Sequence, residues 1–127
     1  MRFHLQTERP LRVETERLGE SVVIHITGQV NEFATDTLSA QLDSVLGEGN
    51  RFIVFDLANV TFLGSTGLGQ IMRAYRVVKS KNGYVRIASA QPLIADVFRL
   101  TKLDTIVKLC PSVEEALTAE HLPPATP

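Results

Sequence analysis

Two adjacent hydroxyl side chains, Ser65 and Thr66, are the residues of this sequence best placed to carry chemistry. Glycines surround them at positions 64, 67 and 69. The preceding residues 52–55 form a continuous apolar run rich in β-branched and aromatic types, which is typical of a strand buried on both faces. From Leu68 onward the apolar residues recur at steps of three and four, which indicates a helix. We therefore expect Ser65 at the N-cap of a helix that follows a buried strand.

The start of a helix attracts anions, because its first N–H groups lack partners and its dipole places partial positive charge there. Gly64 and Gly67 leave the Ser65 hydroxyl uncrowded. A phosphate on Ser65 would therefore lie where the backbone favours it. A plain helix cap, with no role beyond stability, is the alternative interpretation of Ser65 and Thr66.

A serine hydrolase is the first enzymatic alternative. The nucleophile elbow requires Gly-x-Ser-x-Gly, but Leu63 occupies the first glycine position. Ser65 also lacks an evident base, because His4 and His121 lie near the two ends of the chain. His25 lies within a predicted strand, where we expect it to face solvent or a satisfied core site. These residues argue against an enzyme.

A nucleotide site is the second alternative, because Gly64, Gly67 and Gly69 follow a strand and open a helix. Their spacing is reversed from the dinucleotide fingerprint, and no lysine follows them as in a P-loop. The sequence has no Cys/His cluster, and its carboxylates are scattered over different predicted elements. We expect neither a metal nor a cofactor.

The composition limits the partners and the location. With 13 basic and 14 acidic residues, the chain lacks the positive charge that nucleic acids select for. No window reaches the length of a membrane-spanning helix, and residues 1–10 lack the apolar core of a signal peptide. Cys110 is the only cysteine, so it cannot form an internal disulfide, and we expect it to be buried. We predict a cytoplasmic protein.

Hydrophobic periodicity predicts strands and helices in the order ββαβαβαβα. The strands are expected near residues 11–15, 21–27, 52–55, 84–88 and 105–109, and a glycine at position 28 ends the second. A capping box of Ser112 and Glu115 opens the last helix. The expected apolar faces of the four helices are Leu38, Leu42, Val45 and Leu46; Leu68, Ile71, Met72, Tyr75 and Val78; Leu93, Val97 and Leu100; and Val113, Ala116 and Leu117.

Strands that alternate with helices predict an α/β fold with a mixed, mostly parallel sheet and helices packed on it. The short link at residues 17–20 makes the first two strands an antiparallel hairpin. The length suits one domain. We place that domain at residues 11–119, after a loose lead-in at 1–10 and before a disordered tail at 120–127.

The second predicted helix has an unusual outer face, formed by Gly69, Gln70, Arg73, Ala74 and Val77. This face is small and lightly charged, unlike an ordinary solvated surface, so it is a candidate partner-binding surface. The alternative is that other parts of the domain cover the helix.

The sequence resembles the STAS domain, and the closest type is the bacterial anti-sigma factor antagonist. The resemblance covers residues 11–119 and the element order. Its most specific part is the segment at residues 65–69 behind an apolar strand. The segments that carry it are Gly28-Gln29-Val30-Asn31, Phe55-Asp56-Leu57, Val60-Thr61-Phe62-Leu63 and Ser65-Thr66-Gly67-Leu68-Gly69.

The resemblance implies a non-catalytic switch that regulates a sigma factor and thereby transcription. In that family an anti-sigma factor serine kinase phosphorylates the serine at the position of Ser65, and a PP2C-type phosphatase removes the phosphate. The unphosphorylated antagonist binds the kinase and frees the sigma factor. Thr66 is the second-choice acceptor. The alternative is a STAS adaptor that docks on another complex, such as a transporter ATPase, without phosphorylation.

Two positions depart from the family pattern. Gly64 and Asn31 each stand where an aspartate is usual, so negative charge is reduced around the expected phosphate. We expect a monomer or weak homodimer. The predicted partner-binding residues are Gly28, Asn31, Phe33, Gly64, Ser65, Thr66, Gly67, Gly69, Gln70, Arg73 and Val77.

Overall fold

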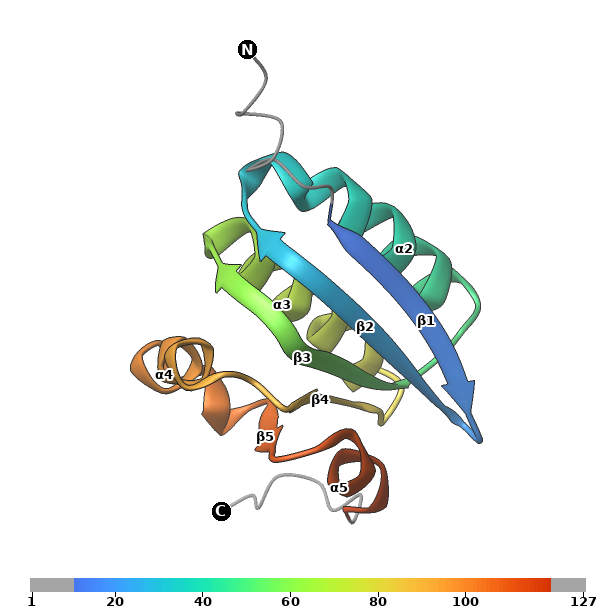
Figure 1. Ribbon diagram of the computed structural model, residues 1–127. Coiled ribbons are helices and arrows are strands. Elements are labelled where there is room, and N and C mark those ends of the chain that lie inside the picture. Colours follow the sequence, from blue (N-terminus) through green and yellow to red (C-terminus); the bar gives the residue numbers. More distant parts are fainter. Residues whose placement is uncertain (1–10, 120–127) are drawn as a thin grey trace.

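Five strands form one mixed sheet in the order β1-β2-β3-β4-β5 (Figure 1). The structure, a computed structural model, describes residues 11–119, so the predicted lead-in and tail lie outside the described residues. The strands are β1 (Arg12–Leu18), β2 (Ser21–Val30), β3 (Phe52–Leu63), β4 (Tyr84–Ala88) and β5 (Lys108–Cys110). The helices are α2 (Thr35–Gly47), α3 (Ser65–Lys79), α4 (Pro92–Leu100) and α5 (Val113–Thr118), with 3₁₀ turns η1 (Glu32–Ala34) and η2 (Leu103–Thr105).

The predicted element order and sheet type are confirmed. Strands β1 and β2 pair antiparallel, and the other three pairings are parallel. Each parallel strand is added on the same side of the one before it, so right-handed crossovers direct α2, α3 and α4 to the same face of the sheet. Figure 1 shows α2 and α3 together on one face and α5 on the other.

The two faces of the sheet carry two separate cores. The larger core joins alternate sheet residues such as Ile24 and Phe55 to the inward sides of α2, α3 and α4. The predicted face of α2, with Leu38 and Leu42, is buried there. The smaller core lies under α5 and comprises Val23, Val54, Ala88, Cys110 and Ala116. Because α5 is short, it does not cover the whole of this second face: Val23 of β2 is buried beneath it, whereas Glu14 and Glu16 of β1 are exposed.

The predicted face of α4 is wrong. Leu93 and Leu100 are 78% and 83% exposed, whereas Ile94 and Phe98 fill the core. Both pairs are apolar, so the sequence offers two candidate stripes on opposite sides of one short helix. The path of the chain from β4 decides which stripe faces the sheet. The predicted start of β5 is also wrong, because η2 occupies residues 103–105 and the strand begins at residue 108.

Strands β2 and β3 are longer than the sequence indicated. Gly28 does not end β2, which continues to Val30 through a backbone φ of +120° at that glycine. In the register of β2 with β3, residue 25 pairs with Asp56 and residue 27 pairs with Asn59, so β3 has one extra residue between these pairs. A second extra residue of β3 follows at residue 61. These bulges keep the two strands paired to their ends. The pairing ends immediately before Ser65.

Buried polar contacts hold α5 on the sheet. Arg86 is 4% exposed, and its guanidinium donates to the carbonyl oxygens of Ala116 and Ala119 at 2.7 and 3.0 Å. The Ser112 hydroxyl accepts from the Glu115 N–H at 3.1 Å, which confirms the predicted N-terminal cap. Cys110 is buried as predicted, and burial raises the pKa of its thiol.

Val54 tests the smaller core. It is fully buried beneath α5, so Val54→Asp would bury a carboxylate beside Arg86 of β4, whose guanidinium already holds the α5 carbonyls. We expect it to lower the free energy of unfolding by roughly 3 kcal/mol or more. Thr61→Asp, at an exposed position of the same strand, is the control. Equal melting temperatures for Val54→Asp and wild type in thermal denaturation would show that α5 does not cover this strand.

Candidate functional site

Ser65 opens helix α3 at the end of β3, but it is not the N-cap. The carbonyl of Gly64 accepts from the Leu68 N–H at 3.0 Å, so Gly64 is the cap residue and Ser65 is the first helical residue. The prediction is wrong by one position, because the longer β3 carries the chain into the helix without a separate turn. Ser65 and Thr66 are both exposed, and no other residue described in the structure hydrogen-bonds the Ser65 hydroxyl.

A main-chain hydrogen bond joins the ends of β2 and β3. The Gly64 N–H donates to the Val30 carbonyl at 3.0 Å, immediately beyond the last strand pair, Val30 with Leu63. The loop after β2 and the start of α3 therefore lie next to each other, as the predicted site required. Gly28 lies in the same strand end, and Gly64 is half-buried.

Gly67 lets the helix start approach this junction closely. It is buried, and a Cβ at this position would lie 2.6 Å from Val30 Cγ1 and 2.7 Å from Leu63 Cδ1. Any side chain there would push α3 away from the two strands. Gly67 is thus a packing residue. Gly69, one turn away from Ser65, is exposed and has open space around it.

Asn31 fixes the loop that follows β2. Its side-chain oxygen accepts from the N–H groups of Phe33 and Ala34 at 3.0 and 3.1 Å, which caps the short helix η1. The resemblance leads one to expect aspartate at position 31. Asn31 makes the two capping hydrogen bonds through its amide oxygen instead. The Phe33 side chain that follows is 88% exposed. Phe33 thus presents an exposed aromatic ring on the turn that Asn31 caps.

Phe62 is a residue of the site that sequence reasoning missed. It is 49% exposed, and its Cε2 lies 3.1 Å from where a Cβ on Gly64 would be. The ring thus occupies the space beside Gly64. The sequence does contain a signal, because Phe62 and Leu63 are consecutive apolar residues in a strand, and neighbouring side chains point to opposite faces.

The outer face predicted for α3 is wrong at Ala74 and, apart from Gly69, only partly exposed elsewhere. Ala74 is fully buried, and Val77 packs against the larger core. Arg73 Nη1 lies 2.8 Å from Asp43 Oδ1 of α2, and its Nη2 hydrogen-bonds Gln70 at 2.9 Å. The domain therefore covers part of this side of the helix, as the alternative interpretation expected, while Gly69 is exposed. The helix packs against α2 as well as the sheet, so its buried arc is wider than a single stripe.

The exposed stripe of α3 runs from the Ser65 turn along the helix. It contains Ser65, Gly69 and Arg76, which are spaced at four and seven residues and so share one side. We use the name Ser65 surface for Phe33, Phe62, Ser65, Thr66 and Gly69.

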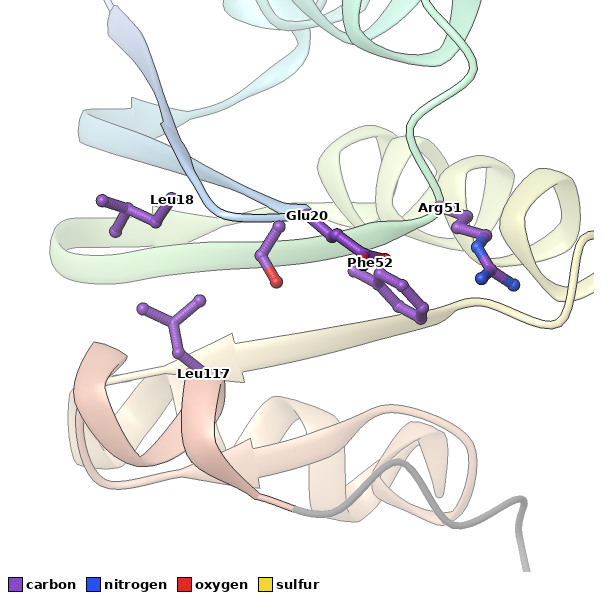
Figure 2. A pocket seen from close by; sticks show the side chains of 6 residues that line it. Leu18, Glu20, Arg51, Phe52 and Leu117 are labelled. Atoms are coloured by element: carbon purple, nitrogen blue, oxygen red, sulfur yellow. The ribbon is translucent and has the colours of Figure 1, made fainter.

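A hollow lies at the opposite end of the sheet, where β2 and β3 begin (Figure 2). Its polar lining includes Arg51, whose guanidinium already stacks 4.6 Å from the Phe52 ring and donates to the Lys81 carbonyl at 3.0 Å. These contacts of Arg51 are structural, and the hollow lies at the end of the sheet away from Ser65. The lining residues are Leu18, Glu20, Ser21, Arg51, Phe52 and Leu117.

The described residues offer neither a metal site nor a membrane span. Over residues 11–119, no three side chains among His, Cys, Asp and Glu gather in a way that would hold a metal ion. In the same part of the chain, no helix is both long and apolar enough to cross a bilayer.

Two glycines of α3 provide a matched test of the packing at the site. Alanine has the higher helix propensity, so Gly69→Ala, in open space, should raise the free energy of unfolding by about 0.5–1 kcal/mol. Gly67→Ala would collide with Val30 and Leu63, and should lower it by about 1–3 kcal/mol. Chemical denaturation measures both. Stabilisation by both substitutions would contradict the close approach of α3 to the strands.

Comparison with known proteins agrees with this architecture. An anti-sigma F factor antagonist of Paenibacillus polymyxa is 24% identical over 110 residues, which are 86% of this chain and 92% of that protein. The crystal structure of an anti-sigma factor antagonist from Mycobacterium paratuberculosis superposes with a TM-score of 0.79 at 26% identity, covering 86% of this chain and 92% of the other. The phosphorylated form of the Bacillus cell fate determinant SpoIIAA has a TM-score of 0.68 at 21% identity, covering 84% and 96%. The STAS domain profile matches residues 12–116, and the chain therefore belongs to the STAS domain family.

Proposed function

We propose that this protein is a non-catalytic, phosphorylation-controlled binding switch of the anti-sigma factor antagonist type. In its unmodified form it binds an anti-sigma factor serine kinase and so regulates a sigma factor and transcription. The observation that supports this most directly is the exposed Ser65 hydroxyl at the start of α3, which has no hydrogen-bond partner among residues 11–119. Similar proteins named anti-sigma factor antagonists support the same assignment.

The backbone around Ser65 suits a phosphate. The N–H groups of Ser65, Thr66 and Gly67 occupy the first turn of α3, where no carbonyl of the same helix is within reach. A phosphate brings about −1.5 to −2 charges at neutral pH, and the positive end of the helix dipole would stabilise that charge. The Bacillus protein SpoIIAA, whose fold this chain shares, has been solved in a phosphorylated form.

The Ser65 surface suits a protein partner. Phe33 and Phe62 present aromatic area on the two segments joined by the Val30–Gly64 hydrogen bond. Aromatic side chains that pack into a partner commonly contribute most of the binding free energy. A partner that covers both rings would also cover Ser65, so a phosphate there would have to be desolvated or excluded. Phosphorylation would then block binding through local contacts, without refolding the domain.

The neutral residues at positions 31 and 64 are compatible with this role. Asn31 retains the capping contacts of η1, and Gly64 leaves room for the Phe62 ring. Neither residue adds negative charge near the phosphate. A PP2C-type phosphatase would complete the cycle by removing the phosphate.

The Ser65 switch predicts three linked outcomes. Incubation with the cognate kinase and ATP should add one phosphate, which intact-mass analysis and peptide mapping assign to Ser65. Ser65→Ala should bind the kinase constitutively, and Ser65→Asp should remain folded but bind at least tenfold more weakly, a loss of about 1.4 kcal/mol or more. Phosphorylation only at Thr66 would refute the assignment of Ser65. Tight binding of Ser65 variants and no phosphorylation would instead favour an adaptor that docks without modification.

Phe33 tests the aromatic contact. We expect Phe33→Ala to weaken kinase binding by about 2 kcal/mol or more in calorimetry, because a central aromatic anchor is removed. Leu93→Ala is a matched control, since Leu93 is also largely exposed but lies on α4. Both variants should keep the melting temperature of the wild type, because neither side chain is buried. Equal affinities for the two variants would remove Phe33 from the binding surface.

A further inference from the structure

A histidine on the same face of the sheet as α5 is held between two carboxylates. His25 of β2 places Nδ1 2.6 Å from Asp56 Oδ2 of β3 and Nε2 2.9 Å from Glu16 Oε1 of β1. The three side chains thus cross three adjacent strands. The His25 side chain is 33% exposed and that of Asp56 only 17%, so the inner contact is well shielded from water.

The geometry sets the protonation state of the ring. An ionised carboxylate can only accept hydrogen bonds, and a neutral imidazole has one N–H donor and one acceptor nitrogen. Carboxylate oxygens on both nitrogens therefore require both to carry protons. We propose that Glu16, His25 and Asp56 form a pH-sensitive tie, in which the His25 imidazolium joins the edge strand β1 to β3.

The tie reaches the first bulge of β3. Asp56 Oδ1 accepts from the Ala58 N–H at 3.1 Å while its Oδ2 contacts His25. The same carboxylate thus holds the extra residue of the bulge and the imidazolium. Loss of the His25 charge would weaken the attachment of β1 to the sheet. It would also weaken the contact that holds the Asp56 carboxylate at the bulge.

Other charges on this face do not replace the tie. Arg12 Nη2 is engaged by Glu14 at 3.0 Å, and Glu14 is the cross-strand neighbour of His25, so it adds a further negative charge. On β4, the neighbour of Asp56 is the uncharged Ala88. The remaining charged side chains that strand register places on this face are Arg86 of β4, which donates to α5, and Lys108 of β5.

The sign of the pH dependence follows from the competing effects on the ring. Burial lowers the pKa of His25, but the hydrogen bonds to Glu16 and Asp56 and the charges of both carboxylates raise it more, so the pKa lies above its ordinary value of 6.5. A pKa raised in the folded state gives stabilisation that is complete below about pH 6.5. That stabilisation is lost as pH rises through the folded-state pKa.

Nuclear magnetic resonance of the imidazole nitrogens in the full chain tests the tie directly. We expect His25 to titrate above pH 6.5, with both nitrogens protonated at pH 6.5. The spectrum of His25→Gln assigns the resonance, since the chain also contains His4 and His121. Asp56→Asn should lower the pKa of His25, whereas Asp43→Asn, which affects a carboxylate paired with Arg73 between helices, should not. A neutral ring at pH 6.5 in the wild type, or a His25 pKa unchanged by Asp56→Asn, would overturn the proposal.

Stability provides the second readout. The unfolding equilibrium constant of wild type, divided by that of His25→Gln, should rise with pH above 6.5, by up to about tenfold per pH unit where the native state holds one extra proton. Amide exchange in β1, corrected for the intrinsic pH dependence, should quicken over the same range in the wild type only. A constant ratio from pH 6 to 9 would contradict the tie. If His25→Gln does not fold, the titration of the wild-type ring still decides.

Discussion

The Val30 carbonyl accepts a hydrogen bond from the Gly64 N–H at 3.0 Å, and the arrangement of the whole Ser65 surface depends on this contact. It holds together two chain segments more than thirty residues apart, the turn after β2 and the start of α3. Gly67 then allows the first turn of the helix to pack directly against Val30 and Leu63. The two bulges of β3 are part of the same constraint, because they adjust the lengths of two unequal strands so that their ends meet.

In the proposed switch, this constraint would let a surface hydroxyl control binding while the fold stays the same. Buried packing lies on the side of Gly67, whereas Ser65 is exposed. The free N–H groups of the first turn are already oriented before any phosphate arrives, so no backbone movement is needed to accept it. The phosphate would therefore act mainly by lowering the affinity for the partner. Phe33, in the turn capped by Asn31, and Phe62, at the end of β3, are exposed in the free protein.

Much of the fold was predictable from the sequence, and the errors in which helix residues are buried share one cause. The element order, the mixed sheet and the buried face of α2 follow from periodicities of two and 3.6 residues. Periodicity does not show which of two apolar stripes faces inward, so Leu93 and Leu100 were placed in the core instead of Ile94 and Phe98. It also does not show that α2 packs beside α3, so Ala74 was placed on the surface.

The location of the candidate site was predictable from the sequence, but the exact cap residue and all of its members were not. The hydroxyl pair behind a buried strand located it, and the resemblance to the STAS domain gave Ser65 a role. The bulges lengthened β3 beyond the predicted end, which shifted the cap to Gly64 and brought Phe62 into the site. The Glu16–His25–Asp56 contact was out of reach for a similar reason, since it depends on the register of three strands.

The central claim is that phosphate on Ser65 acts on the complex and leaves the domain unchanged. Amide chemical shifts of the unmodified and Ser65-phosphorylated chains, recorded alone and with the anti-sigma factor kinase, test it most directly. We predict that the free proteins differ only around residues 28–33 and 62–69, and that added kinase perturbs these resonances in the unmodified chain alone. Shifts that spread across β4, β5 and α5 on phosphorylation, or equal perturbation of both forms by the kinase, would contradict it.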